Sequence, residues 1–110
     1  KNGMIVLVGR NNKENDILTL KTASSRDTWF HTKDIPGSHV ILFTEGTEPS
    51  DKALEQAAAI AAYYCATANQ PRVPVDYTKV RHVKKPQGAK PGMVIYHEYR
   101  TVNVNPKGEI

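Results

Sequence analysis

The sequence contains a single cysteine, Cys65, and no apolar run approaching the roughly 20 residues that cross a membrane. An internal disulfide is therefore excluded, and the chain is compatible with a reducing cytosol. No secretory signal peptide is visible. The chain starts at Lys1 and reaches a strand-like apolar segment almost at once. We therefore expect a cytoplasmic domain of a larger multidomain protein, without membrane insertion.

The spellings of familiar catalytic sites are also absent. There is no G-x-S-x-G elbow, no H-E-x-x-H helix and no G-x-x-x-x-G-K phosphate loop. Cys65 lies among alanine, tyrosine and threonine, which do not activate a thiol as a nucleophile; a buried small hydrophobic residue is the competing interpretation. We expect no catalytic activity and no cofactor.

The remaining candidates for chemistry are the four histidines, His31, His39, His82 and His97. Acidic residues lie close in the sequence to two of them, His31 and His97. A metal site built from His31, His39 and a carboxylate requires the two imidazoles to face each other across a hairpin, and no spacing rule dictates that. In the alternative interpretation, both are hydrogen-bonding residues on strands, available to phosphates or bases. We expect no metal ion.

Positive charge is concentrated in one part of this chain of net charge +4. Residues 71–92 hold six basic residues and one acidic residue, whereas the rest of the chain holds nine basic and ten acidic residues. All of the positive excess therefore lies in this segment. A concentrated basic patch attracts polyanions such as nucleic-acid backbones, and the alternative is a solvated basic surface loop.

Apolar patterning predicts the elements of the first half. Residues 4–8 form a continuous branched apolar run, typical of a strand buried on both faces. Asp16 can cap a short helix that carries Ile17, Leu18 and Leu20, with a strand over residues 17–20 as the alternative. Residues 28–32 and 38–43 predict a β-hairpin, with a tight turn at residues 34–37.

The second half alternates one helix with extended segments. Ser50 is a good helix N-cap, and the helix should run to about residue 68 with an alanine-rich face toward a sheet. Residues 73–77 predict an edge strand, because Pro74 cannot donate to a ladder. Residues 85–92 predict a loop with fixed bends, and residues 93–104 a returning strand.

Together these elements predict one α+β domain over residues 1–110. We expect a mixed, largely antiparallel sheet of about five or six strands, packed against one long helix plus a short helix. A chain of this length buries one modest core and has no room for a second domain.

Two parts of this domain suit binding. The polar segment 9–16 offers Arg10 and three asparagines just before a helix start, where an anion is favoured; the alternative is an asparagine-rich turn that bonds to itself. Trp29 and Phe30 are adjacent strand residues on opposite faces. Either one is exposed for base stacking, or both are core residues with a helix on each side of the sheet.

The basic segment has an alternating pattern from residue 77 to residue 85. If the backbone there is extended, Lys79, Arg81 and Lys85 lie on one face, in a row suited to follow a phosphate chain. Lysine contacts of this kind position a nucleic acid rather than read its sequence.

An ordered set of motifs resembles the NFACT-R domain, the C-terminal module of the bacterial RqcH family, also labelled fibronectin-binding protein A. The resemblance covers most of the chain and rests on Gly9-Arg10-Asn11-Asn12 with Asn15-Asp16, Asp27-Thr28-Trp29-Phe30-His31, Pro36-Gly37-Ser38-His39-Val40, Val75-Asp76-Tyr77-Thr78, and Val83-Lys84-Lys85-Pro86 with Lys90-Pro91-Gly92.

The resemblance implies a role in ribosome quality control. Family members act on large ribosomal subunits that are obstructed by a peptidyl-tRNA, recruit alanyl-tRNA and promote alanine tailing. It implies a non-catalytic module that contacts tRNA or rRNA, beside the other domains of the same protein. The candidate contacts are Arg10, Asn11, Asn12, Asn15, Trp29, His31, Lys33, His39, Lys79, Arg81, Lys84, Lys85 and Lys90. The alternative is a fragment of a fibronectin-binding adhesin at the cell surface.

Overall fold

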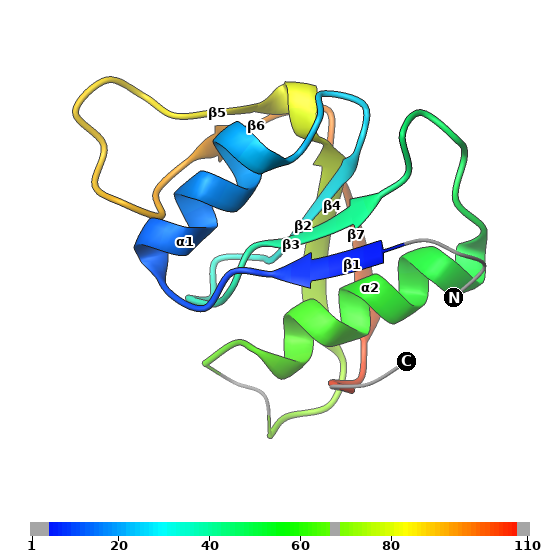
Figure 1. Ribbon diagram of the computed structural model, residues 1–110. Helices are drawn as coiled ribbons and strands as arrows, with labels where there is room; N and C mark the ends of the chain where they lie inside the picture. Colours follow the sequence, from blue (N-terminus) through cyan, green and yellow to red (C-terminus); the bar gives the residue numbers. More distant parts are fainter. Residues whose placement is uncertain (1–4, 67–68, 108–110) are drawn as a thin grey trace.

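The computed structural model describes residues 5–66 and 69–107, which form three layers (Figure 1). A five-stranded sheet is the middle layer. Helix α2 (Asp51–Tyr63) packs on one face, and helix α1 (Asn12–Ile17) lies on the other face beside a small hairpin. The α+β class is therefore confirmed. No helix among the described residues has the length and apolar character needed to span a bilayer.

The large sheet has the strand order β1-β3-β2-β4-β7, and all of its pairings are antiparallel. The expected mixture of parallel and antiparallel pairs is therefore wrong for the described residues. The strands are β1 (Ile5–Val8), β2 (Thr28–Thr32), β3 (Val40–Phe43), β4 (Val73–Lys79) and β7 (Arg100–Val104).

The predicted hairpin is confirmed. Strand β2 has the expected bounds, and β2 pairs with β3 in antiparallel register, with Trp29 opposite Ile41. The turn uses Asp34 at a φ of 56°, a left-handed conformation that aspartate tolerates better than most residues. Strong strand formers flank a seven-residue connection, residues 33–39, that contains Pro36 and Gly37, and β3 begins at Val40, two residues later than predicted.

Strand β1 does not have the predicted burial. It pairs with β3 at the end of the strand order, and its side chains alternate between exposed and half-buried, with Ile5 60% exposed. The apolar run indicated a strand correctly, but only one side of β1 packs against the domain. Residue 4 of the predicted strand lies outside the described residues.

Strand β4 was expected at an edge and is instead an interior strand between β2 and β7. Pro74 is the second residue of β4, and the residue-by-residue pairing of β4 with β2 extends only from Lys79 back to Val75. Pro74 is tolerated because it lies one residue outside this paired stretch. The carbonyl oxygen of Pro74 still accepts from the backbone N–H of Lys33 at 2.9 Å. The missing N–H therefore falls where the β2 ladder has already stopped.

Helix α2 begins as predicted and ends early. The Ser50 side chain caps it by accepting from the backbone N–H of Ala53 at 3.1 Å. The alanines of its inner face are buried against the sheet. The helix has 13 residues and ends at Tyr63, five residues before the predicted end, which lies outside the described residues.

Replacing the cap residue tests this local account. We expect Ser50→Ala to lower the free energy of unfolding by about 1 kcal/mol, because the N–H of Ala53 loses its acceptor. Urea denaturation followed by circular dichroism measures the change. Ser25→Ala, at an exposed position outside a helix start, is the control; an equal effect of both substitutions would contradict the capping role.

Helix α1 starts five residues earlier than predicted. Its N-cap is Asn11, whose side chain accepts from the backbone N–H of Glu14 at 2.8 Å, and not Asp16. The helix continues as a π-helical turn, η1 (Leu18–Thr22), so the alternative of a strand over residues 17–20 is wrong. Asp16 does not cap the helix because its carboxylate binds the loop of residues 85–93 instead, as described below.

The basic segment is not extended as expected. After β4 the chain forms a 3₁₀ turn, η2 (Val80–His82), and then β5 (Val83–Lys84), which pairs with β6 (Ile95–Tyr96). The predicted strand 93–104 is therefore two strands, β6 and β7, that belong to different sheets. The 3₁₀ turn removes the period-2 alternation on which the predicted row of cations depended.

Both faces of the central sheet carry a core. Phe30 and its neighbours pack with α2, whereas Trp29, Ile41, Val80 and Val83 form a second cluster on the opposite face. Trp29 and Phe30 are each 0% exposed. The alternative in which both aromatic residues are core, with a helix on each side, is therefore confirmed, and Trp29 is not exposed for base stacking.

Candidate nucleic-acid interface

Two polar segments that are far apart in the sequence meet at Asp16 on helix α1. One carboxylate oxygen of Asp16 lies 3.1 Å from the Lys85 ammonium, and the other accepts from the backbone N–H of Gly92 at 3.0 Å. Both partners belong to the loop of residues 85–93. One carboxylate near the end of α1 therefore docks the Pro- and Gly-rich loop onto this helix.

The Lys85 ammonium also organises the loop from inside. It donates to the backbone carbonyl of Lys90 at 2.6 Å and to that of Met93 at 3.1 Å, and its side chain is only 25% exposed. With Asp16, all three N–H directions of the ammonium have an acceptor. Lys85, a predicted RNA contact, is therefore used within the fold.

Gly92 closes the junction with α1. Its φ of 84° lies in the left-handed region, and a Cβ built on it would lie 2.7 Å from Oδ1 of Asn12. A side chain at this position would clash with the first residue of α1 and strain the backbone. The loop therefore approaches α1 as closely as its backbone allows.

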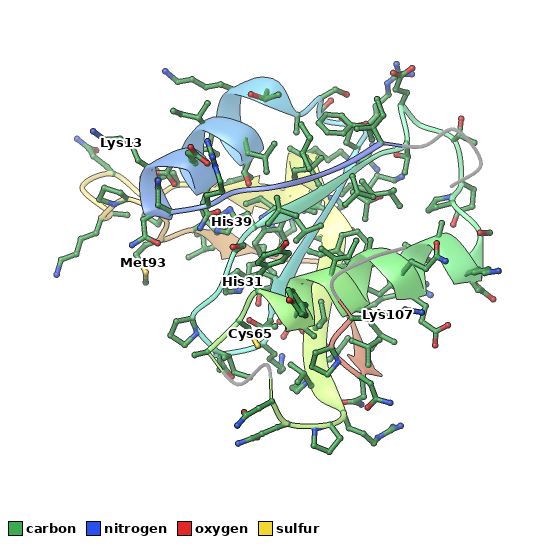
Figure 2. All side chains as sticks on the ribbon, turned by 60° about the horizontal axis from the view of Figure 1, so that its bottom comes forward. Lys13, His31, His39, Cys65, Met93 and Lys107 are labelled. Atoms are coloured by element: carbon green, nitrogen blue, oxygen red, sulfur yellow. The ribbon has the colours of Figure 1, made fainter. Side chains whose placement is uncertain are left out.

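This docking places exposed polar and cationic side chains around one edge of the domain, which we call the α1–loop surface: Asn12, Lys13, Lys84, Lys90 and Met93. All five are exposed. Figure 2 shows Lys13 and Met93 on the same side of the molecule, far from Lys107. The cations of this surface come from both the first and the last third of the chain.

Other predicted contacts at the start of α1 have structural roles. The Arg10 guanidinium makes a two-pronged ion pair with Glu14, at 3.1 and 3.0 Å, and this hydrogen bonding lowers the pKa of the Glu14 carboxyl. Asn11 caps the helix. Asn15 is buried, and its Oδ1 accepts from the backbone N–H of His39 at 3.1 Å. The self-bonding interpretation therefore holds for Asn11, whereas Asn15 bonds to the backbone of a distant residue.

A cavity of about 200 Å³ lies under the loop and is lined by Trp29, His31, His39 and Tyr96, together with Asp34 and residues 92–94. The two imidazoles contact each other in a T-shaped arrangement, with ring centroids 5.3 Å apart. Burial lowers the pKa of His31, and burial together with His31 lowers the pKa of His39 to about 4. Both rings are therefore neutral at physiological pH, and His39, which is 1% exposed, is not a surface contact.

Below this cavity, Asp76 joins three strands through a buried carboxylate that is 0% exposed. It accepts from the hydroxyl groups of Tyr96 and Thr101, the latter at 2.6 Å, and lies 3.6 Å from the Lys33 ammonium. Burial and the bond to Asp76 raise the pKa of Tyr96. Lys33 also donates to the Tyr99 hydroxyl at 3.2 Å, which raises the pKa of the lysine.

The predicted cationic surface between residues 71 and 92 is only partly assembled. Arg72 precedes β4 and Lys79 ends it, so the seven-residue strand separates them by about 20 Å. Arg72 lies instead in a groove with Lys52 and Lys107, on the α2 side of the domain. Lys79 precedes the 3₁₀ turn and Arg81 lies within it, while Lys84 and Lys90 belong to the α1–loop surface.

Sequence reasoning missed two features of this region. Lys13 was overlooked because nothing in the sequence shows that the loop of residues 85–93 docks on the helix that carries Lys13. Among the described residues, one group of three side chains is close enough to hold a metal ion, and it is His82, His97 and Glu98 rather than a group with His31 and His39. Hairpin register is the signal that finds it: Val83 opposite Tyr96 places His82 beside His97.

Comparisons with known proteins find relatives of this chain. The chain matches the family model described as the NFACT protein RNA binding domain over residues 1–98. It is 50% identical over 107 residues to the Rqc2 homolog RqcH of Bacillus subtilis (strain 168), and 45% identical over 102 residues to the Rqc2 homolog RqcH of Streptococcus suis (strain 05ZYH33). These matches cover 97% and 93% of the chain but only 18% of each relative.

A solved structure has the same fold. The C-terminal part of the fibronectin/fibrinogen-binding protein from Streptococcus suis superposes with a TM-score of 0.90 at 44% sequence identity. The match covers 96% of this chain and 42% of that one. Sequence and structure comparisons therefore point to the same group of proteins.

Proposed function

Because the chain belongs to the NFACT protein RNA-binding domain family, we propose that it is the RNA-contacting module of an RqcH-type ribosome quality-control factor, and that it binds tRNA or rRNA through the α1–loop surface. The observation that supports this proposal is the docking of the basic loop onto α1 by Asp16, because α1 carries Lys13, the loop carries Lys90, and Lys84 directly precedes the loop. Asn12 supplies a donor and an acceptor between these cations.

The contacts would be chiefly with phosphates. Lysine ammonium groups act as point charges that position a backbone without reading bases, so the surface suits a folded RNA better than a particular sequence. The neutral His31 at the rim of the cavity adds a hydrogen-bonding group without charge. Lys79 and Arg81 would extend the contact along the 3₁₀ turn.

The full-length protein would act on large ribosomal subunits that still hold a peptidyl-tRNA, recruit alanyl-tRNA and promote alanine tailing in the cytoplasm. In that process the domain is non-catalytic, and other domains of the same protein share the recognition of RNA and subunit. These are proposals for a protein of which the chain spans a minor part.

Charge neutralisation on one side of the domain tests the proposed interface. We expect Lys13→Gln/Lys84→Gln/Lys90→Gln to weaken tRNA binding roughly 10-fold or more at low salt, because three phosphate contacts are lost. The slope of log affinity against log salt should fall by about one for each lysine. Fluorescence anisotropy with labelled tRNA and the 110-residue chain measures both quantities.

The matched control removes the same number of charges from the α2 side, in Lys52→Gln/Arg72→Gln/Lys107→Gln. These residues line one groove, and none contributes to the α1–loop surface. The control should bind tRNA with nearly the affinity of the unmodified chain. Equal weakening by both triple variants would place the interface elsewhere, and binding that does not depend on salt would exclude phosphate neutralisation.

Fibronectin binding is the second candidate, because a relative with the same fold is a fibronectin/fibrinogen-binding protein. Solid-phase binding to fibronectin separates the two functions. Binding that persists at high salt and in the Lys13/Lys84/Lys90 triple variant would favour the adhesin function. Loss of both tRNA and fibronectin binding in that variant would indicate one shared polyanion-binding surface.

A further inference from the structure

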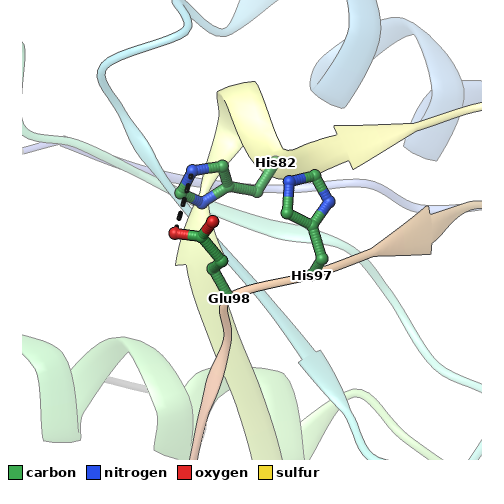
Figure 3. Close-up of side chains that lie close together, drawn as sticks. All are labelled: His82, His97 and Glu98. Atoms are coloured by element: carbon green, nitrogen blue, oxygen red, sulfur yellow. Dashed lines mark ion pairs between the residues drawn. The ribbon is translucent and has the colours of Figure 1, made fainter.

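Three side chains with metal-binding groups converge where the β5–β6 hairpin returns to the main sheet (Figure 3). His82 ends the 3₁₀ turn, and His97 and Glu98 lie between β6 and β7. One ligand atom from each residue lies within 4.8 Å of the other two. Nε2 of His82 is 3.8 Å from a carboxylate oxygen of Glu98, and the two imidazole centroids are 4.9 Å apart.

The backbone holds the two contributing segments together. The N–H of His97 donates to the carbonyl oxygen of His82 at 3.2 Å, which continues the pairing of β5 with β6. Glu98 has a φ of 51°, in the left-handed region that glycine and asparagine prefer. The chain turns sharply at Glu98, and the carboxylate lies beside His82 in Figure 3. The cluster is therefore set by the hairpin and its exit turn.

Thr78 fixes which nitrogen of His82 faces the cluster. The Thr78 hydroxyl lies 3.1 and 3.2 Å from the backbone carbonyls of His97 and Glu98, and 3.0 Å from Nδ1 of His82. Its single hydrogen goes to a carbonyl, so the hydroxyl oxygen must accept from Nδ1–H of His82. This tautomer leaves the Nε2 lone pair directed at Glu98. A ring whose second nitrogen donates to a fixed acceptor is the usual arrangement of a metal-binding histidine.

We propose that His82, His97 and Glu98 form a binding site for a divalent transition-metal ion of the zinc class. Two imidazoles and one carboxylate are the ligand set that such ions accept, with a fourth position open, whereas magnesium and calcium prefer oxygen ligands alone. Nothing in the ribosome quality-control proposal requires this ion, so the site is a separate property of the domain.

Binding requires a small closure of the side chains. Zinc bonds of about 2.0–2.1 Å place ligand atoms roughly 3.3 Å apart, so the three groups must approach one another. His97 and Glu98 are exposed and can rotate. Arg81, whose Nε lies 3.5 Å from Nε2 of His82, must turn away, and it is also exposed. This cation makes the site weaker than a buried structural zinc site.

Titration with metal tests the site without RNA. We expect Zn²⁺ to bind the untagged 110-residue chain at a ratio of one to one in isothermal titration calorimetry, and Co²⁺ in its place to give the visible absorption of a low-coordinate site. His97→Ala and Glu98→Gln should each weaken Zn²⁺ binding at least about 10-fold, and so should Thr78→Val, which removes only the positioning hydroxyl. Millimolar Mg²⁺ should not compete.

The matched control is Glu48→Gln, an exposed carboxylate in the groove of about 300 Å³ that His82 and Glu98 also line. It should bind Zn²⁺ like the unmodified chain. His97→Ala and Glu98→Gln change exposed side chains, and unaltered circular dichroism will confirm that both variants are folded. Absence of Zn²⁺ binding, equal affinity in these two variants, or displacement by Mg²⁺ would each overturn the proposal.

Discussion

Asp76→Ala should lower the free energy of unfolding by about 3–5 kcal/mol, the typical cost of removing one partner from a buried charged network. The substitution leaves the hydroxyl groups of Tyr96 and Thr101 without their common acceptor, inside a region where Asp76 itself is 0% exposed. It also leaves the Lys33 ammonium without its carboxylate. The two hydroxyl groups add a desolvation penalty that the folded state cannot recover, whereas the partly exposed Lys33 ammonium is solvated.

Asp76→Asn separates geometry from charge. The amide keeps an acceptor for Tyr96, and the Thr101 hydroxyl can reverse and accept from the amide nitrogen, so the expected loss is nearer 1 kcal/mol. Asp34→Asn is the matched control, because it removes an exposed carboxylate at the same cavity and asparagine tolerates the left-handed φ of this position. Urea denaturation measures all three variants. A loss in Asp76→Ala no larger than that in Asp34→Asn would show that the network does not stabilise the fold.

The network also connects stability with the proposed interface. Tyr96 belongs to β6, lines the cavity beneath the loop and packs on Trp29, with ring centroids 4.6 Å apart. Releasing its hydroxyl group loosens the hairpin that carries the loop at residues 85–93. Asp76→Ala should therefore weaken tRNA binding even where the variant is still folded, although Asp76 cannot touch RNA.

Local signals in the sequence predicted local structure well. The bounds of β2, the Ser50 cap and the pairing of β2 with β3 follow from neighbouring residues, and the structure confirms them. Pro74 shows where a local rule fails. Proline excludes a ladder bond only where a partner strand extends that far, and the length of β2 cannot be read from the residues around Pro74.

The candidate interface was less predictable because it depends on contacts between distant residues. Lys85 and Lys90 are equivalent in the sequence, yet Asp16, 69 residues away from Lys85, binds Lys85 inside the loop and leaves Lys90 exposed. Asn15 and Asn12 differ in the same way, since only Asn15 faces His39. The composition of the segments indicated an RNA-binding class, but the fold decides which side chains are available.

Acidification should destabilise the domain through His39. Burial holds the pKa of His39 at about 4 in the folded state, against an ordinary value near 6.5 in the unfolded chain. As the pH falls below about 6.5, the unfolded chain binds a proton that the folded chain does not, so the free energy of unfolding decreases. From pH 7 to pH 5 this single group should remove about 2 kcal/mol, and the loss should level off near pH 4.

Two substitutions isolate this effect, measured by urea denaturation at a series of pH values. His39→Asn removes the imidazole and should flatten the dependence of unfolding free energy on pH by about one proton between pH 5 and pH 6.5. The hydroxyl group of Thr19 forms a 2.8 Å hydrogen bond with Nδ1 of His39, and His39→Asn removes this bond together with the imidazole. Thr19→Val breaks the same bond but keeps the imidazole. It should therefore lower stability at pH 7 and retain the dependence of the unfolding free energy on pH. If His39→Asn kept the same dependence of the unfolding free energy on pH as the unmodified chain, the acid sensitivity would arise from another group.

Because His39 lines the cavity beneath the loop, the same protonation would disturb the proposed RNA-binding surface before the whole domain unfolds.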